Sequence, residues 1–269
     1  GTGGVGVGYR ALKANTTANN NTAVGYDAGV SLTTGGQNTV VGTLALDAAT
    51  TADSNTAIGY LALSANTTAD NNTALGRSTL AANTTGAQNI AIGPYALDAN
   101  TTADDNIAIG YDCLGGNTTG AGNVAIGRNA LYANTTVSNL TAIGYMALNA
   151  NTTGTNGVAV GKDALQSNTT GDNNTAVGLE ALQTNTTGGS NTAVGTGSLA
   201  LATTANYNTA IGRAALGVLT TGGNNTSVGA LALDACTTGD SNTCVGYNAG
   251  TAVTTGTNNT YIGLSAGQA

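Results

Sequence analysis

The sequence has no histidine, tryptophan or phenylalanine, and charged residues make up only 7% of its 269 positions. A disordered chain normally has a higher net charge and fewer β-branched residues than this one, in which threonine, valine and isoleucine are abundant. The net charge of −7 disfavours nucleic acid and anionic membrane surfaces as partners, because both require basic patches. No apolar run approaches the roughly 20 residues of a membrane helix. Neither nucleic-acid binding nor membrane insertion is therefore expected.

Cysteine is scarce as well, and the chain begins at a glycine. Cys113, Cys236 and Cys244 are an odd number at unequal positions of the repeat described below. We interpret them as small apolar substitutes for alanine or asparagine, not as a disulfide framework. Gly1 is not preceded by an initiator methionine, and no signal peptide follows it. We therefore expect a mature product or a fragment.

What the sequence has in abundance is glycine at a strict period. Sixteen glycines, each preceded by Val, Ile or Leu, recur every 17 residues from Gly8 to Gly263 without an insertion or a deletion. Self-similarity at a fixed period indicates a solenoid with one coil per copy. We number the positions of a copy as slots 1 to 17, so that this glycine is slot 5. The copies begin at residues 4, 21, 38, 55, 72, 89, 106, 123, 140, 157, 174, 191, 208, 225, 242 and 259. No linker interrupts them, so residues 1–269 are predicted to form a single repeat domain.

The slots divide into strand and turn positions. Slot 4 is always aliphatic, slot 9 is mostly Leu, and slot 2 alternates between Thr and Val or Ile. Alternate residues of a strand share a face, so slots 2 and 4 are predicted to face the interior. The glycine of slot 5 would end that strand at a corner, slots 8 and 9 would form a second short strand, and slots 12 to 14 a third. All charged residues fall in slots 6, 7, 10, 16 or 17, where turns and solvent are expected.

These patterns predict the fold class. Each copy has a glycine in mid-pattern and alternation in place of helical spacing, so helix is not expected. The prediction is an all-β protein, a β-solenoid of the parallel β-roll or β-helix type, with 17 residues per coil and about 16 coils.

One stretch carries a family resemblance. Asn55–Ala65, which reads Asn-Thr-Ala-Ile-Gly-Tyr-Leu-Ala-Leu-Ser-Ala, resembles the head repeats of YadA-like trimeric autotransporter adhesins and similar Asn-Thr-Ala-rich repeats of phage tail-fibre-like proteins. The shared signature is Ala-[Val/Ile]-Gly-x-x-Ala, seen again at Ala91–Ala96, and it covers nearly the whole chain. The resemblance implies a left-handed parallel β-roll, three chains per head, and an adhesive or fibre-forming role outside the cell. The adhesin repeats are usually shorter, and the extra length of this chain falls around Asn-Thr-Thr.

No combination of residues predicts catalysis. Left-handed β-helix acyltransferases usually rely on histidine, which this chain lacks, and its carboxylates lie singly on turns without a recurring pair for acid–base chemistry. The calcium-binding pattern Gly-Gly-x-Gly-x-Asp is absent. Acids of slot 16, such as Asp53 and Asp70, give way to Ala, Gly or Thr in other copies. We therefore expect no enzyme activity, no metal and no cofactor.

The triplet Asn-Thr-Thr in slots 12 to 14 has two interpretations. It matches the Asn-x-Thr acceptor pattern for glycans. Alternatively, the asparagines form an internal ladder in which each side chain bonds to the same residue one coil away. The ladder is favoured because Leu32, Ala49 and Cys236 replace the asparagine in other copies. On the glycan interpretation the acceptors are Asn15, Asn66, Asn83, Asn100, Asn117, Asn134, Asn151, Asn168 and Asn185.

Two exposed features are candidates for ligand binding. Thr occupies slots 13 and 14 in every copy that reaches them, and adjacent strand residues face opposite ways, so one Thr column is predicted to point outward and one inward. An outward face on which Asn and Thr alternate resembles ice-binding solenoids. The tyrosines of slot 6 could form a row of rings on which glycans stack. Arg, Lys, Thr or Leu replace Tyr in other copies, which favours the interpretation that these side chains pack over the corner of the coil. Ice or glycan binding by the Thr/Asn face is thus the alternative function.

The preferred function is a non-catalytic structural rod of an extracellular fibre or filament, an adhesin or a phage-type appendage. It would lie outside the cell, at the cell surface or on a virion. Slots 1, 3 and 5 carry no charge in any copy, and an uncharged strip of small residues is unusual for a solvated surface. We predict that this strip, represented by Ala57, Ala91 and Ala125, is a self-association face, most simply of a lateral homotrimer.

The ends carry a further expectation about partners. Gly1–Tyr9 and Asn259–Ala269 contain no charged residue. Charges on a terminal coil would prevent its unpaired backbone groups from pairing with the strands of another chain. An end-to-end filament, or a longer chain, is therefore expected, with Gly1 at slot 15 and Ala269 at slot 11 of the coils that would meet. Surface glycans are a further candidate partner.

Overall fold

The computed structural model describes residues 2–268, and it is a β-solenoid. It has about 15 turns and 16 parallel strands that recur 17 residues apart, with no helix in residues 2–268. The predicted all-β solenoid is therefore confirmed. Gly1 and Ala269, to which the predicted end-to-end contact refers, lie outside the described residues.

The chain divides into two compact units, Gly1–Asn139 and Leu140–Ala269. The period of 17 residues is the same in both. The strands of the first unit are β1 (Val5–Val7), β2 (Thr22–Val24), β3 (Thr39–Val41), β4 (Thr56–Ile58), β5 (Thr73–Leu75), β6 (Ile90–Ile92), β7 (Ile107–Ile109) and β8 (Val124–Ile126). Those of the second unit are β9 (Thr141–Ile143), β10 (Val158–Val160), β11 (Thr175–Val177), β12 (Thr192–Val194), β13 (Thr209–Ile211), β14 (Thr226–Val228), β15 (Thr243–Val245) and β16 (Thr260–Ile262).

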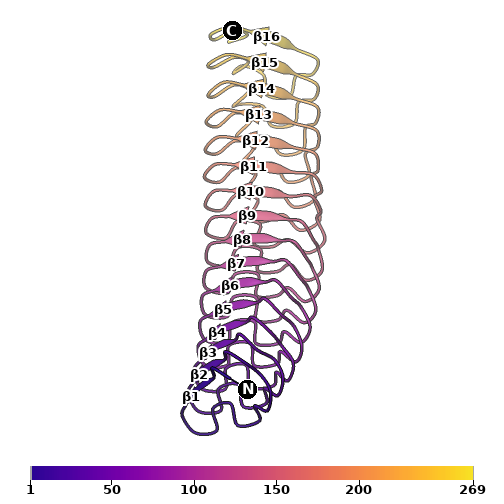
Figure 1. Ribbon diagram of the computed structural model, residues 1–269. Coiled ribbons are helices and arrows are strands. Elements are labelled where there is room, and N and C mark those ends of the chain that lie inside the picture. Colours follow the sequence, from indigo (N-terminus) through magenta and orange to yellow (C-terminus); the bar gives the residue numbers. More distant parts are fainter. Residues whose placement is uncertain (1, 269) are drawn as a thin grey trace. The chain divides into compact units, whose positions relative to one another are not determined.

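Within each unit every strand pairs in parallel with the next strand of the chain. Figure 1 shows β1 to β8 stacked in chain order, and likewise β9 to β16. The register places equal slots side by side, as in the pairing of Ala57 with Ala74 in β4 and β5. Identical side chains of neighbouring coils therefore stack into columns that run along each unit.

Each coil contains one strand, in slots 2 to 4, where the sequence predicts three. Slots 6 to 10 form a turn and slots 13 and 14 a bend, so the predicted second and third strands are wrong. For the second strand the reason is backbone conformation: slots 7 and 9 have positive φ, as at Leu61 (57°) and Leu63 (53°), which lies outside the β region. Hydrogen bonds between coils continue through these segments all the same, for example from the Leu63 amide to the Thr79 carbonyl oxygen at 3.0 Å.

The prediction that slots 2 and 4 face the interior is also wrong. Alanine in slot 3 is fully buried throughout, whereas slots 2 and 4 are half-buried or exposed. Slot 3 faces slot 8 across a narrow interior: the Ser227 hydroxyl donates to the Ala232 carbonyl oxygen at 2.8 Å, and a Cβ placed on Gly6 would lie 3.8 Å from that of Ala11. Most positions on these facing walls can hold only a small side chain. The β-branched residues are therefore outside.

Slot 5 forms the predicted corner, and only glycine fits there. At Gly59 φ is 141°, and an added Cβ would lie 2.2 Å from the carbonyl oxygen of Gly76 in the next coil. The interior beyond this corner is filled by Leu of slot 9 and small residues of slot 8. Cys113, Cys236 and Cys244 are buried free thiols at interior slots, which confirms their interpretation as small apolar substitutes.

Candidate functional site

The asparagines of slot 12 form the predicted internal ladder. In the first unit the Asn100 side-chain amide donates to Asn83 Oδ1 at 2.8 Å and to the Ala103 carbonyl oxygen of its own coil at 3.1 Å. In the second unit Asn168 donates in the same way to Asn151 Oδ1, at 2.9 Å. The amide groups of Asn100 and Asn168 thus each link two coils and also close the bend of their own coil.

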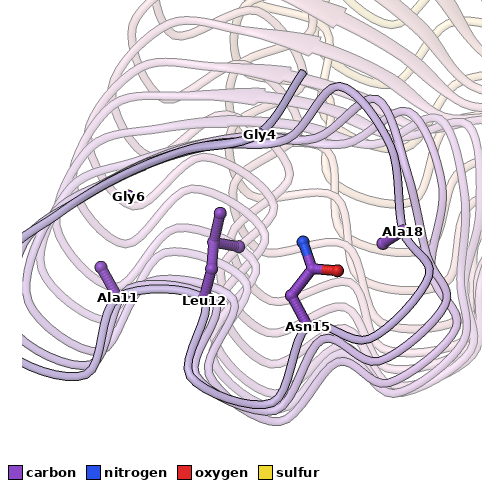
Figure 2. Close-up of a pocket in the computed structure, with 6 residues that line it drawn as sticks. All are labelled: Gly4, Gly6, Ala11, Leu12, Asn15 and Ala18. Carbon is purple, nitrogen blue, oxygen red and sulfur yellow. The ribbon is translucent and has the colours of Figure 1, made fainter. Parts of the chain in front are cut away.

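This ladder overturns the glycan interpretation of Asn-Thr-Thr. The side chains of Asn66, Asn83, Asn100, Asn117, Asn134, Asn151, Asn168 and Asn185 are at most 2% exposed. Asn15 is half-buried, and Figure 2 shows its side chain pointing into the interior of the coil. A glycan needs an exposed amide nitrogen, but here that nitrogen points inward. The acceptor prediction is therefore wrong at the eight buried positions, and Asn15 has the same inward orientation.

A second asparagine ladder, at slot 1, was missed by sequence reasoning. Asn55 accepts the backbone N–H of Asn72 at 2.9 Å, and its own amide donates to the Ala69 carbonyl oxygen at 2.9 Å. Slot 1 is buried in every copy that has Asn there, except at Asn259 in the last copy. The recurrence of Asn at slot 1 could have predicted this ladder. The sequence-based prediction instead placed slot 1 on the outer face, together with slot 3.

The predicted self-association face lies inside the solenoid. Ala57, Ala91 and Ala125 are 0% exposed, because slot 3 faces the interior. These alanines cannot contact another chain, and the prediction is wrong for a physical reason: the alternation was assigned to the opposite face.

The outer face of the sheet consists of slots 2 and 4 instead. These positions hold Thr, Val, Ile and Leu, and none is charged in any coil. Exposed members include Leu75 at 43%, Ile90 at 39% and Ile211 at 41%. In each unit the outer face is thus an uncharged surface with two columns of β-branched and aliphatic side chains. Such a surface is unusual for a chain fully surrounded by water.

Both threonine columns lie at the surface. Slot 14 is exposed in all copies, as predicted for the outward column, whereas slot 13 is half-buried or exposed and not inward. The slot 13 hydroxyl donates to the slot 13 carbonyl oxygen of the next coil, for instance from Thr84 to Thr101 at 2.9 Å. Asn of slot 12 points inward, so no face with alternating Asn and Thr exists. The exposed columns are Thr next to Thr.

Acidic side chains of slot 16 have a structural role. Asp172 Oδ1 accepts the Thr155 backbone N–H and hydroxyl, both at 2.7 Å, and these bonds lower the pKa of its carboxyl group. Residues 2–268 contain no group of three or more His, Cys, Asp or Glu arranged to hold a metal ion. Within the same residues no helix has the length and apolar character needed to cross a membrane.

Tyrosine and arginine form an exposed row in the first unit. Arg77 lies between two rings, with its Cζ 5.9 Å from the Tyr60 centroid and 5.6 Å from that of Tyr95, and Arg128 lies 5.5 Å from the Tyr111 centroid. Tyr95 and Tyr111 meet edge to face at 5.9 Å. The slot 6 tyrosines stay about half exposed, so they cover the corner only in part.

Beside this row lies a cleft of about 410 Å³. Its lining residues are Tyr95, Asp98, Ala99, Tyr111, Asp112, Gly115, Gly116 and Tyr132. Burial raises the pKa of both Asp98 and Asp112, and the negative charge of Asp112 raises that of Asp98 further. This cleft has three tyrosines and two aspartates in its lining, more of both than either hollow described below. Sequence reasoning, which treated all coils as equivalent, did not single out this site.

Two further hollows have simpler linings. The hollow in Figure 2, of about 300 Å³, is the interior of the first complete coil and is lined by Gly4, Gly6, Ala11, Leu12, Asn15 and Ala18. A polar groove of about 250 Å³ in the second unit lies over slots 14 to 17. The first has no charged lining residue, and the second has one carboxylate, that of Asp172.

Comparisons with known proteins give no relative from which a role could be transferred. No protein family, curated protein or solved structure matches the chain. Any functional assignment therefore depends on the residues themselves.

Proposed function

We propose that this chain is a non-catalytic structural component of an extracellular fibre, adhesin or phage-type appendage, and that it assembles laterally with copies of itself through the outer face of its sheet. One observation carries the proposal: slots 2 and 4 present an uncharged face of β-branched and aliphatic side chains in every coil. The sequence resemblance to YadA-like head repeats supports the same role and a position outside the cell.

The chemistry of this face favours a second copy of the chain as its partner. Charges are confined to slots 6, 7, 10, 16 and 17, which leaves the strand face free of repulsion between identical chains. A stable interface requires about 800 Å² from each partner, with an apolar centre and a polar rim. Two columns repeated over eight strands in each unit provide an extended apolar centre, and the flanking turns provide the rim. A homotrimer is the simplest closed assembly that the resemblance suggests.

Lysine substitution on the face tests this assembly. Ile58→Lys, Ile109→Lys and Ile126→Lys together place three charges in slot 4 of the first unit, where the native side chains are half-buried. A matched control places lysines at slot 10 instead, as Ser64→Lys, Ala81→Lys and Gln166→Lys, since Lys13 is native to that slot. We expect sedimentation analysis to show a trimer for the wild type and the control and a monomer for the slot 4 variant, with unchanged circular dichroism. A wild type that stays monomeric at high micromolar concentration would refute the proposal.

A second candidate function is ice binding by the exposed Thr column of slot 14. The observation that favours it is the exposure of this Thr in every coil at a constant register. Thr102→Tyr, Thr119→Tyr and Thr136→Tyr should abolish any thermal hysteresis of the wild type while leaving the fold intact. Hysteresis that persists in this variant would exclude the slot 14 column as the ice-binding surface.

A further inference from the structure

The cleft at slots 6 to 11 is lined by a coil that lacks side chains at two successive positions. In the coil that begins at residue 106, slots 10 and 11 are Gly115 and Gly116, whereas the coils on either side have Asp98 with Ala99 and Tyr132 with Ala133. A Cβ on Gly115 would lie 2.3 Å from Asp112 Oδ1, so the carboxylate occupies the space that a side chain would take. The absence of a side chain at Gly115 therefore admits the Asp112 carboxylate to the lining of the cleft.

Aromatic rings form the walls of the cleft. The planes of Tyr95 and Tyr111 are 77° apart, so the two rings form adjoining walls, and Tyr132 comes from the next coil. Tyr111 and Tyr132 are 46% and 43% exposed, which leaves ring surface available to a ligand. Arg77 and Arg128 already lie against Tyr95 and Tyr111 without lining the cleft, so rings of this group hold cations in the structure itself.

The two carboxylates of the cleft lack a cationic partner. In residues 2–268 the ion pairs join Arg10 to Asp27 and Lys162 to Asp163, and neither involves Asp98 or Asp112. The two groups are close enough for the charge of Asp112 to act on Asp98. A neutral ligand would leave this repulsion in place, whereas a cation would relieve it.

We propose that the cleft formed by Tyr95, Asp98, Tyr111, Asp112 and Tyr132 binds an organic cation with an ammonium group. The aromatic faces attract the cation through their quadrupoles, and the carboxylates neutralise its charge. Such a group occurs on free amines and on the lysine side chains of other proteins, and the cleft suits the chemistry of both. This inference does not depend on lateral assembly, because the cleft lies on the turns and not on the strand face.

Ligand-detected NMR or calorimetry with the full chain tests the proposal. The probes are choline, the amide-capped amino acid Nα-acetyl-lysine methylamide, and 3,3-dimethylbutan-1-ol, which has the shape of choline without its charge. We expect at least one cation to bind in the millimolar range and the neutral alcohol to bind at least about tenfold more weakly. Binding of choline alone would indicate a quaternary ammonium ligand, and binding of the lysine derivative would indicate a primary ammonium such as the lysine side chain of a protein partner.

Variants assign the binding to this cleft. Asp98→Asn with Asp112→Asn, Tyr111→Leu, and the filling variant Gly115→Gln should each weaken binding about tenfold or more. Gln is native to slot 10 at Gln166 and Gln183, so the filling variant keeps a side chain that the fold accepts. The controls Asp234→Asn and Tyr247→Leu, in slots 10 and 6 of the second unit, should leave binding unchanged, and circular dichroism verifies the fold of each variant.

Several outcomes would overturn the proposal. These are equal binding of choline and its neutral analogue, binding of neither cation at about 20 mM, and cation binding that survives the Gly115→Gln variant. Binding of methyl glucoside with no binding of either cation would assign the cleft to a neutral sugar instead.

Discussion

Buried asparagine side chains hold neighbouring coils in register. Where the preceding coil also has Asn in slot 12 of the same unit, the amide donates to two acceptors, as Asn100 does to one in the preceding coil and to one in its own. A buried amide left without such partners would cost about 1–3 kcal/mol, so the columns disfavour a shift of one coil against the next. The ladder ends where an apolar residue takes the slot, as at Ala202 in the second unit.

Extending the ladder by one residue should stabilise the second unit. Asn185 Oδ1 is buried and has no hydrogen-bond partner, because Ala202 occupies slot 12 of the next coil. Ala202→Asn would supply a donor to this oxygen and to the Ala205 carbonyl oxygen, with an expected gain of about 1 kcal/mol. Denaturant midpoints measure the gain. The control Ala200→Asn, at the half-buried slot 10, should have no effect, and equal midpoints for the two variants would contradict the ladder argument.

The carboxylates of the cleft should make stability depend on pH. Burial, and then the charge of Asp112, raise the pKa of Asp98 in the folded state, so folding is favoured when this group is protonated. That stability is fully present below the unfolded pKa of about 3.9 and is lost as the pH rises through the raised folded value. Asp98→Asn removes the ionisation and should raise the melting temperature at pH 7, with the gain vanishing below about pH 4.

Asp172 provides a control of opposite sign. Bonds from Thr155 lower the pKa of Asp172, so its stabilising contribution is present at neutral pH and is lost as the pH falls through the lowered value. Asp172→Asn should therefore lower the melting temperature slightly at pH 7, and less so in acid. A fall in melting temperature for Asp98→Asn at pH 7 would contradict the repulsion inferred within the cleft.

At the scale of the structural element, the coil is a strand of three residues followed by a long turn. The strand ends at a glycine because its corner has a φ that other residues rarely adopt and because the next coil passes within contact distance. The turn then uses left-handed residues at slots 7 and 9, including leucines whose side chains fill the interior. The corner tolerates glycine alone, whereas the turn tolerates other residues.

Substitutions at these two kinds of glycine should differ sharply. Gly59→Ala would place Cβ 2.2 Å from the Gly76 carbonyl oxygen, and backbone of a neighbouring coil cannot move away without breaking the ladder. We expect a loss of more than about 3 kcal/mol or failure to fold. Gly197, with φ 67° and open space around its Cβ position, is the matched case. Gly197→Asn should be neutral or slightly stabilising in urea denaturation, since Asn129 and Asn248 occupy the same slot. Similar losses for both variants would refute this distinction.

At the scale of the whole molecule, each of the two units is a series of similar coils. Each coil bonds to the coil before it and the coil after it within its unit, so no central core depends on all of them. Length in such an architecture is set by copy number, and function by what the outer slots present.

Deletion of one coil tests this modularity. Removing residues 72–88 joins Asn71 in slot 17 to Asn89 in slot 1, so all columns keep their alignment. We expect a folded protein with the same circular dichroism per residue, because each remaining coil regains an equivalent neighbour. Removing residues 72–87 instead shifts one column against the next and turns interior residues outward, and this variant should aggregate or unfold. If both deletions behaved alike, the coils would not be independent units.

The sequence by itself determined the period, the all-β solenoid, the glycine corner, the outward Thr column and the confinement of charge to turns, because each follows from a residue type recurring every 17 positions. The internal asparagine ladder of slot 12 could also be predicted, since apolar residues replace Asn there.

Tertiary structure decided which face of the strand is inside. Alternation defines two faces but not their direction, and here the close approach of slots 3 and 8 admits Ala57, Ala91 and Ala125 while it excludes most β-branched side chains. The cleft likewise needed three dimensions, because Tyr95, Asp112 and Tyr132 meet only when three successive coils are stacked.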